Sequence, residues 1–179
     1  MTPNADLREA PAQAAPAARH AVDREALRDF IELEAELLDR QQFAAWCDLY
    51  ADDGAYWVPA QQDQDSYLSH VSLFYDEKPI MKTRVARLLH PMIHCQDPKS
   101  HCVRVISNLR IDSVSDDGAL IQVASKFIML EDRVGAERRV FGGRYLHTLR
   151  REGNSFRIVV KRVDLTNCDH SFPALTQPI

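Results

Sequence analysis

The sequence lacks the features that would assign it quickly to several common classes of protein. Its apolar runs are only a few residues long, so it contains no segment of about 20 apolar residues that could cross a membrane as a helix. Its four cysteines are too few and too scattered for a disulfide framework, and none of them form a Cys-x-x-Cys pair. No Gly-x-Ser-x-Gly motif is present, which leaves nucleophilic hydrolysis without support. At 179 residues, we expect one domain in the cytoplasm, without a membrane partner.

Basic residues are also too few for a nucleic-acid-binding protein, because 22 Lys and Arg side chains face 26 Asp and Glu side chains and give a net charge of −4. The charge is unevenly distributed. Residues 1–90 carry 9 basic and 16 acidic side chains (−7), whereas residues 91–179 carry 13 and 10 (+3). The two halves can form solvated faces of opposite sign, or they can steer one protomer onto a neighbour.

The chain divides into an arm and one domain. Residues 1–20 are rich in Ala and Pro and predict a flexible N-terminal arm, and residues 21–179 predict a single domain. Asp23 is a good N-cap for a helix over 24–39 that has one apolar face. Glu34 lies in the middle of that face, which indicates either a buried carboxylate with a perturbed pKa or, the reading we favour, a carboxylate paired with an Arg of the packed sheet.

Two more helices and a sheet follow. The spacing of aromatic residues predicts a helix over 43–51, which Asp52-Asp53-Gly54 ends. A short strand is predicted over 55–58. Pro79 suits the first turn of a third helix, which Pro91 ends. Its buried face would hold Ile80, Met81, Val85, Leu88 and Leu89. Four long strands are predicted over 102–114, 119–132, 138–151 and 155–166, with Gly-containing turns between them. Val103, Val105, Leu109 and Ile111 share a parity and hence one predicted face. Helices followed by hairpins indicate an α+β fold in which the helices cover a curved antiparallel sheet, a cone with an internal pocket.

Several groups could carry chemistry. The histidine- and cysteine-rich stretch of His90, His94, Cys95, His101 and Cys102 has N and S donors that suit zinc, but Pro91 interrupts a shared helix and the spacing is irregular, so ordinary loop and core residues are favoured. Cys168-Asp169-His170 has the form that begins a Rieske ligand set, and no second pair follows it. A pocket acid–base pair of Asp53 with His94 or His101 remains an alternative.

Arginines are frequent in the last two predicted strands. Parity places Arg138 and Arg144 on one face and Arg139 and Arg151 on the other. Planar guanidinium groups make bidentate contacts with carboxylates at protein interfaces, so these residues are either subunit contacts or the charged protection of a sheet edge. No aromatic ladder interleaves with them, as a single-stranded nucleic-acid platform requires.

A series of short motifs runs along residues 22–179. The motifs are Glu36-Leu37-Leu38-Asp39-Arg40, Phe43, Trp46, Leu49-Tyr50, Asp52-Asp53, Tyr56-Trp57, Pro59, Ser69-His70, Tyr75-Asp76-Glu77, Arg84-Val85, Arg87-Leu88, Pro98, Ser100, Ile106-Ser107-Asn108, Gly143-Arg144-Tyr145 and Lys161-Arg162-Val163-Asp164-Leu165. In this order and spacing the chain resembles one family, the small (beta) subunits of Rieske non-haem iron aromatic-ring-hydroxylating dioxygenases.

The resemblance implies the cone-shaped fold of nuclear transport factor 2 and scytalone dehydratase. It also implies a structural role in aromatic compound catabolism, with no metal, cofactor or catalytic residue in this chain. The Rieske iron–sulfur cluster and the mononuclear iron would belong to a catalytic alpha subunit in an α3β3 hexamer that contains a beta trimer. NADH would supply electrons through a reductase, with or without a ferredoxin. Trp57, Arg138, Arg144 and Arg162 are then candidate subunit contacts.

Two other functions remain open at this point. One is a stand-alone cone-fold dehydratase or isomerase that uses Asp53 with His94 or His101. The other is a module that binds a small ligand in the same pocket without chemistry.

Overall fold

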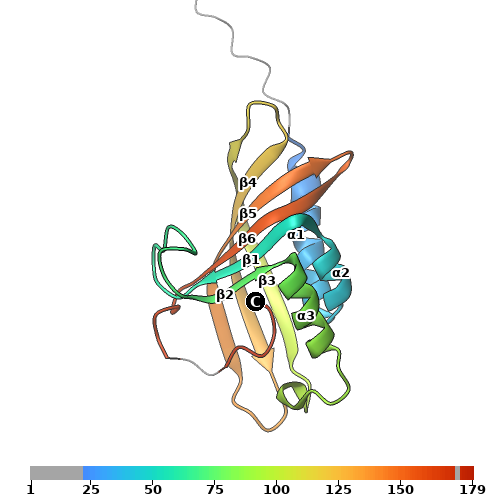
Figure 1. Ribbon diagram of the computed structural model, residues 1–179, viewed down its shortest axis with the longest axis vertical. Coiled ribbons are helices and arrows are strands. Elements are labelled where there is room, and N and C mark those ends of the chain that lie inside the picture. The colour runs from blue at the N-terminus through green and yellow to red at the C-terminus, as the bar shows by residue number, and fades with distance from the viewer. Residues whose placement is uncertain (1–21, 172–173) are drawn as a thin grey trace, which may run out of the picture.

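The computed structural model describes residues 22–171 and 174–179 and contains a long curved sheet with three helices on one of its faces (Figure 1). The predicted arm over 1–20 lies outside the described residues. The elements in order are α1 (Arg24–Asp39), α2 (Phe43–Asp48), β1 (Tyr50–Pro59), β2 (Ser72–Glu77), α3 (Lys78–Leu88), the 3-10 turn η1 (His94–Gln96), β3 (His101–Val114), β4 (Leu120–Asp132), β5 (Arg139–Glu152) and β6 (Ser155–Leu165). The predicted α+β cone is confirmed.

The sheet has six strands in the order β2-β1-β6-β5-β4-β3. The four long strands agree with their predicted ranges to within one or two residues and are antiparallel neighbours as predicted, whereas β1 joins the sheet by pairing with β6 in parallel. Tight turns force β3 to β6 to be antiparallel neighbours. β1 reaches β6 from far away in the sequence, so no turn determines their relative direction.

Helix α1 has the predicted bounds and the predicted cap, because the Asp23 carboxylate accepts hydrogen bonds from the backbone N–H of Glu25 (2.9 Å) and of Ala26 (3.1 Å). The helix also covers the open edge of the sheet at β3. The guanidinium of Arg24 donates to the carbonyl of Leu109 (2.8 Å). An edge strand has backbone groups without strand partners, and α1 satisfies some of them.

We predicted that Asp52-Asp53-Gly54 ends a helix, and this prediction is wrong. Helix α2 ends at Asp48, and these residues lie inside β1. Gly54 is needed for close packing: a Cβ there would lie 2.7 Å from the carbonyl oxygen of Ile158.

We predicted that Val103, Val105, Leu109 and Ile111 lie on one face of β3. This is wrong, because the first two and the last two lie on opposite faces. Val103 and Val105 are 58% and 59% exposed, whereas Leu109 is buried and Ile111 is partly buried against the core. The pairing of β3 with β4 shifts register between residues 107 and 110, where Asn108 has a φ of 54°. A bulge of this kind moves the following side chains to the other face.

The predicted apolar face of α3 is only partly buried. Met81 and Val85 are in the core, but Ile80 and Leu89 are 50% and 55% exposed. Among the described residues, none of the helices is both long enough and apolar enough to cross a membrane.

The neighbouring residues Gly142 and Gly143 of β5 provide a test of this packing. A Cβ at Gly143 would lie 2.0 Å from the carbonyl oxygen of Asp164 in β6, whereas at Gly142 the nearest atom would be 3.6 Å away. Gly143→Ala should therefore lower the free energy of unfolding by at least about 1–3 kcal/mol, and Gly142→Ala by much less. Urea denaturation followed by circular dichroism checks both variants. Equal losses would contradict the close approach of β5 and β6.

Candidate functional site

A buried charged cluster joins α1 to the sheet inside the cone. Glu34 is 1% exposed, and its Oε1 lies 2.8 Å from the Nζ of Lys161 on β6 and accepts a hydrogen bond from the Nε1 of Trp46 (2.9 Å). Its Oε2 lies 3.0 Å from the Nε2 of His147 on β5. The expectation that Glu34 is paired is confirmed. The expected Arg partner is wrong, because the cation is Lys161.

The local sequence explains this arrangement. Glu34 lies on the apolar face of α1, and that face packs against the sheet. His147 and Lys161 are direct partners in the β5–β6 register, and both side chains are fully buried on the inner face. The Lys161 ammonium also lies 4.2 Å from the centre of the Tyr145 ring, a cation–π contact.

The charges of the cluster stabilise one another. Burial by itself would raise the pKa of Glu34, but the nearby Lys161 charge and the His147 contact outweigh it and hold the pKa below its ordinary value. Burial lowers the pKa of Lys161, and the Glu34 carboxylate opposes that shift. Both oxygens of Glu34 are engaged, so the arrangement locks α1 onto β5 and β6 and leaves no carboxylate oxygen of Glu34 free. The Nδ1 of His147 is buried without a hydrogen-bond partner among the described residues.

The structure does not bring the predicted acid–base residues together. Asp53 is exposed on β1, where Arg150 binds both of its carboxylate oxygens at 2.7 and 2.9 Å and, by this hydrogen bonding, lowers its pKa. His94 is exposed on η1, and His101 is exposed at the start of β3, which lies four strands away from β1 in the sheet order. The buried carboxylate–imidazole pair of the cone is Glu34 with His147, which the sequence patterns did not reveal.

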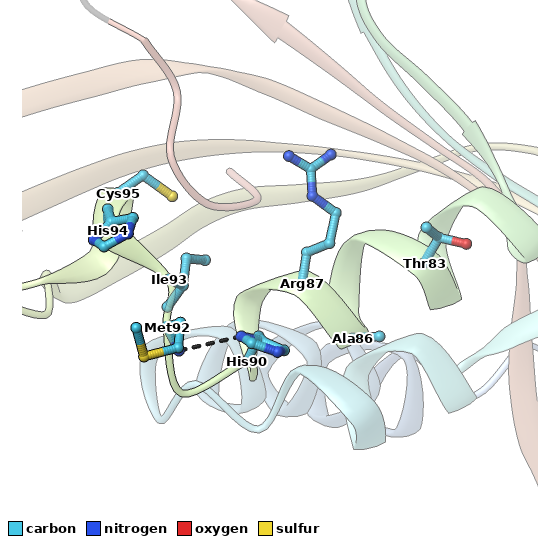
Figure 2. Close-up of a pocket in the computed structure, with 8 residues that line it drawn as sticks. All are labelled: Thr83, Ala86, Arg87, His90, Met92, Ile93, His94 and Cys95. Carbon is cyan, nitrogen blue, oxygen red and sulfur yellow. Dashed lines mark hydrogen bonds between the residues drawn. The ribbon is translucent and has the colours of Figure 1, made fainter.

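A surface hollow of about 520 Å³ lies between the end of α3 and η1. Figure 2 shows the imidazoles of His90, in the loop after α3, and of His94, on η1, at separate corners of it. The Nδ1 of His90 accepts a hydrogen bond from the backbone N–H of Met92 (3.1 Å). Nowhere in 22–171 or 174–179 do three His, Cys, Asp or Glu side chains gather as metal ligands.

The outer face of the sheet, opposite the helices, brings two of the candidate contact residues together. The guanidinium of Arg162 lies 4.5 Å from the centre of the Trp57 ring, and its Nε is 2.6 Å from an oxygen of Asp164. Tyr67 contacts Trp57 edge to face (6.5 Å between centroids) and stacks on Tyr75 (3.9 Å). A shallow hollow of about 270 Å³ adjoins Trp57 and Arg162.

The other two candidate contact residues, Arg138 and Arg144, lie immediately before β5 and on it. Arg144 is exposed on β5 and stands opposite Lys126 of β4 and Asp164 of β6. Arg138 immediately precedes β5, and its Nε is 2.9 Å from an oxygen of Asp132. We predicted that Arg139 lies on the other face of the sheet from Arg138 and Arg144. This is confirmed, since its side chain is 21% exposed and pairs with the buried Glu131.

Sequence reasoning missed one exposed apolar surface, which we call the outer strip: Val103, Val105, Ile128 and Val140, which are 58–66% exposed. Val105 and Ile128 are direct partners, and Val103 and Val140 flank Leu130. A signal was present in the run Phe127-Ile128-Met129-Leu130, which is apolar at both parities. A strand that is apolar on both sides is typical of a sheet covered on both faces.

Comparison with known proteins agrees with this architecture. A model of the family described as "Ring hydroxylating beta subunit" matches residues 33–170. The small oxygenase component of the p-cumate 2,3-dioxygenase system of Pseudomonas putida is 33% identical over 143 residues, which cover 79% of this chain and 78% of that protein. The chain belongs to the ring-hydroxylating beta subunit family. A second relative, the biphenyl 2,3-dioxygenase subunit beta of Rhodococcus jostii, is 27% identical over 161 residues, 86% of this chain and 83% of that protein.

Solved structures agree with the fold of this beta subunit family. The beta subunit of benzoate 1,2-dioxygenase from Burkholderia mallei has a TM-score of 0.70 at 24% identity and covers 83% of this chain and 94% of that one. A scytalone dehydratase-like protein from Novosphingobium aromaticivorans has a TM-score of 0.58 at 14% identity, covering 79% and 83%. Membership of the beta subunit family disfavours the two alternative functions.

The Glu34 cluster predicts a particular acid response. A carboxyl group whose pKa is lower in the folded state contributes stability that is fully present above its unfolded pKa, near 4.5, and is lost as the pH falls through the folded value. Stability below pH 4.5 should therefore fall more steeply for the wild type than for Glu34→Gln. Denaturant titrations at several pH values check this. Glu36→Gln, at an exposed site on the same helix, is the control and should keep the wild-type dependence of unfolding free energy on pH. If Glu34→Gln also kept that dependence, the role of the cluster would be refuted.

Proposed function

We propose that this chain is the beta subunit of the terminal oxygenase of an aromatic-ring-hydroxylating dioxygenase, and that it supports a catalytic alpha subunit in aromatic compound catabolism. The observation that carries the proposal is the family match over 33–170. The engaged state of Glu34 adds to it, because the polar core of the cone has the character of a structural network.

The alpha partner would hold the Rieske cluster and the mononuclear iron. A Rieske centre needs two Cys and two His ligands, and the residues of this chain do not fit it. Cys168 is buried whereas His170 is exposed, and across the described ranges no group of three potential ligands forms around either residue. Electrons would reach the alpha subunit from NADH through a reductase, with or without a ferredoxin.

The outer strip is the surface by which copies of this chain would associate in the beta trimer of an α3β3 hexamer. It exposes contiguous apolar side chains beside the cations Lys126, Arg138 and Arg144. The loop between β1 and β2 has the complementary character, since it exposes Leu68 and Val71, 81% and 76% exposed, and carries Asp63 and Asp65. Two different complementary patches make a head-to-tail contact, the kind that closes into a ring.

Co-expression with the alpha partner tests the proposed function. The two chains should copurify as a hexamer, and iron and acid-labile sulfide should follow the alpha chain when the subunits are separated. An alpha chain that is stable and fully active without this protein would refute the supporting role.

A substitution in the outer strip tests the assembly. Ile128→Asp places a charge on an apolar contact, so it should lower the association constant of the trimer at least tenfold. Analytical ultracentrifugation measures this constant. Val134→Asp is the matched control, because Val134 is 75% exposed at the β4–β5 turn and lies outside the strip. A trimer that survives Ile128→Asp would exclude the strip as the interface.

A further inference from the structure

The segment 174–179 occupies the end of the cone that is lined by Tyr56, Gln96, Arg104 and Arg139, which we call the mouth of the cone. Ile179 is 0% exposed and belongs to the main hydrophobic core, Gln177 and Pro178 are buried, and Leu175 packs against the core. Figure 1 shows this end of the chain, in dark red, returning across the sheet towards α3. The segment is neither helix nor strand, so regular backbone pairing does not explain why it lies there.

Side chains of the cone hold the deep end of the segment. The hydroxyl of Tyr56 accepts a hydrogen bond from the backbone N–H of Ile179 (2.9 Å) and donates to its main-chain oxygen (3.3 Å). The guanidinium of Arg104 donates to the carbonyl of Pro178 (2.7 Å). Two adjacent main-chain oxygens and one amide are therefore recognised by two buried side chains.

Two further side chains hold the outer end. The Nε2 of Gln96 on η1 donates to the hydroxyl of Thr176 (2.8 Å), and Arg139 of β5 donates to the carbonyl of Ala174 (3.0 Å). The four recognising residues come from four different elements, β1, η1, β3 and β5.

The recognising groups are positioned by the cone itself. Arg104 has a side chain that is 1% exposed, and Asp39 fixes it by accepting from its guanidinium and, at 2.8 Å, from its backbone N–H. Tyr56 is held between aromatic rings, with its centroid 5.6 Å from that of Trp46 and 6.0 Å from that of Phe74. Donors held in place without the help of the ligand are the mark of a built site, because little ordering is needed on binding.

We propose that the mouth of the cone is a binding site for an N-acylated amino acid or peptide end with a branched aliphatic side chain, and that segment 174–179 is its resident ligand. The apolar core receives the aliphatic group, Tyr56 donates to the oxygen of Ile179, and Arg104 donates to the carbonyl oxygen of the preceding residue. Because side chains make these contacts, a separate molecule with the same groups can replace the segment. The inference goes beyond the supporting role, which does not require a ligand.

The decisive experiment cuts the folded chain. A protease site inserted after Ser171 allows the full chain to fold before the segment is severed, and native mass spectrometry then shows whether the segment stays bound. We expect it to stay and to exchange with an excess of labelled peptide Ala-Leu-Thr-Gln-Pro-Ile, but at least tenfold more weakly with the same peptide carrying Ile179→Asp. Displacement by N-acetylisoleucine as well would identify free small molecules as a second source of ligand. Immediate loss of the segment, with no binding of the peptide, would overturn the proposal.

Two tyrosine variants, each carrying the same protease site and cut in the same way, test the contact made by the Tyr56 hydroxyl. Tyr56→Phe removes only the hydroxyl that contacts Ile179 and should weaken peptide binding by about tenfold. Tyr50→Phe is the matched control, since the Tyr50 hydroxyl is buried without a hydrogen-bond partner among the described residues. Equal peptide affinity in the two variants would contradict the assigned role of Tyr56.

Discussion

The carboxylate of Glu34 is the charged group around which the cone is packed. It lies among side chains of α2, β5 and β6, and all of them reach it inside the core. Burying one of these charges without its partner would be costly, about 3–5 kcal/mol when a buried ion pair is broken. An arrangement of the helices that separated Glu34 from Lys161 would therefore carry this cost. The same contacts engage both carboxylate oxygens of Glu34, whereas a catalytic carboxylate would need a free one.

In the described part of the chain, the three helices cover one face of the sheet and leave its outer face without a helix (Figure 1). Helix α1 covers the edge at β3, and segment 174–179 fills the mouth. The outer face carries the outer strip and the contact of Arg162 with Trp57, which combine apolar, aromatic and arginine side chains. Such a composition is typical of protein interfaces. A protein whose interior is filled and whose outer face is apolar is well suited to hold other subunits in position.

The sequence predicted local features well and long-range ones poorly. The bounds of α1 followed from Asp23 and a helical apolar face, and the four long strands followed from alternation and from turns at Gly118, Gly135 and Gly153, all of which have positive φ. The parallel pairing of β1 with β6 and the bulge at Asn108 were not predictable, because both depend on contacts between distant segments.

The site shows the same division. The apolar setting of Glu34 predicted a paired carboxylate, but identifying Lys161 and His147 as its partners required the strand register. Residues 174–179 carry no periodic pattern, so nothing local indicated that Ile179 is buried.

The central claim is that the buried cluster is structural and that the chemistry belongs to the alpha partner. The most direct measurement is oxygen uptake per assembled oxygenase complex, with an aromatic compound that the wild-type complex oxidises, when this chain carries Glu34→Gln. Our account predicts unchanged uptake per complex, also where fewer complexes form. A tenfold or larger loss in intact, iron-loaded complexes would contradict it, because it would make the Glu34 cluster part of the catalytic machinery.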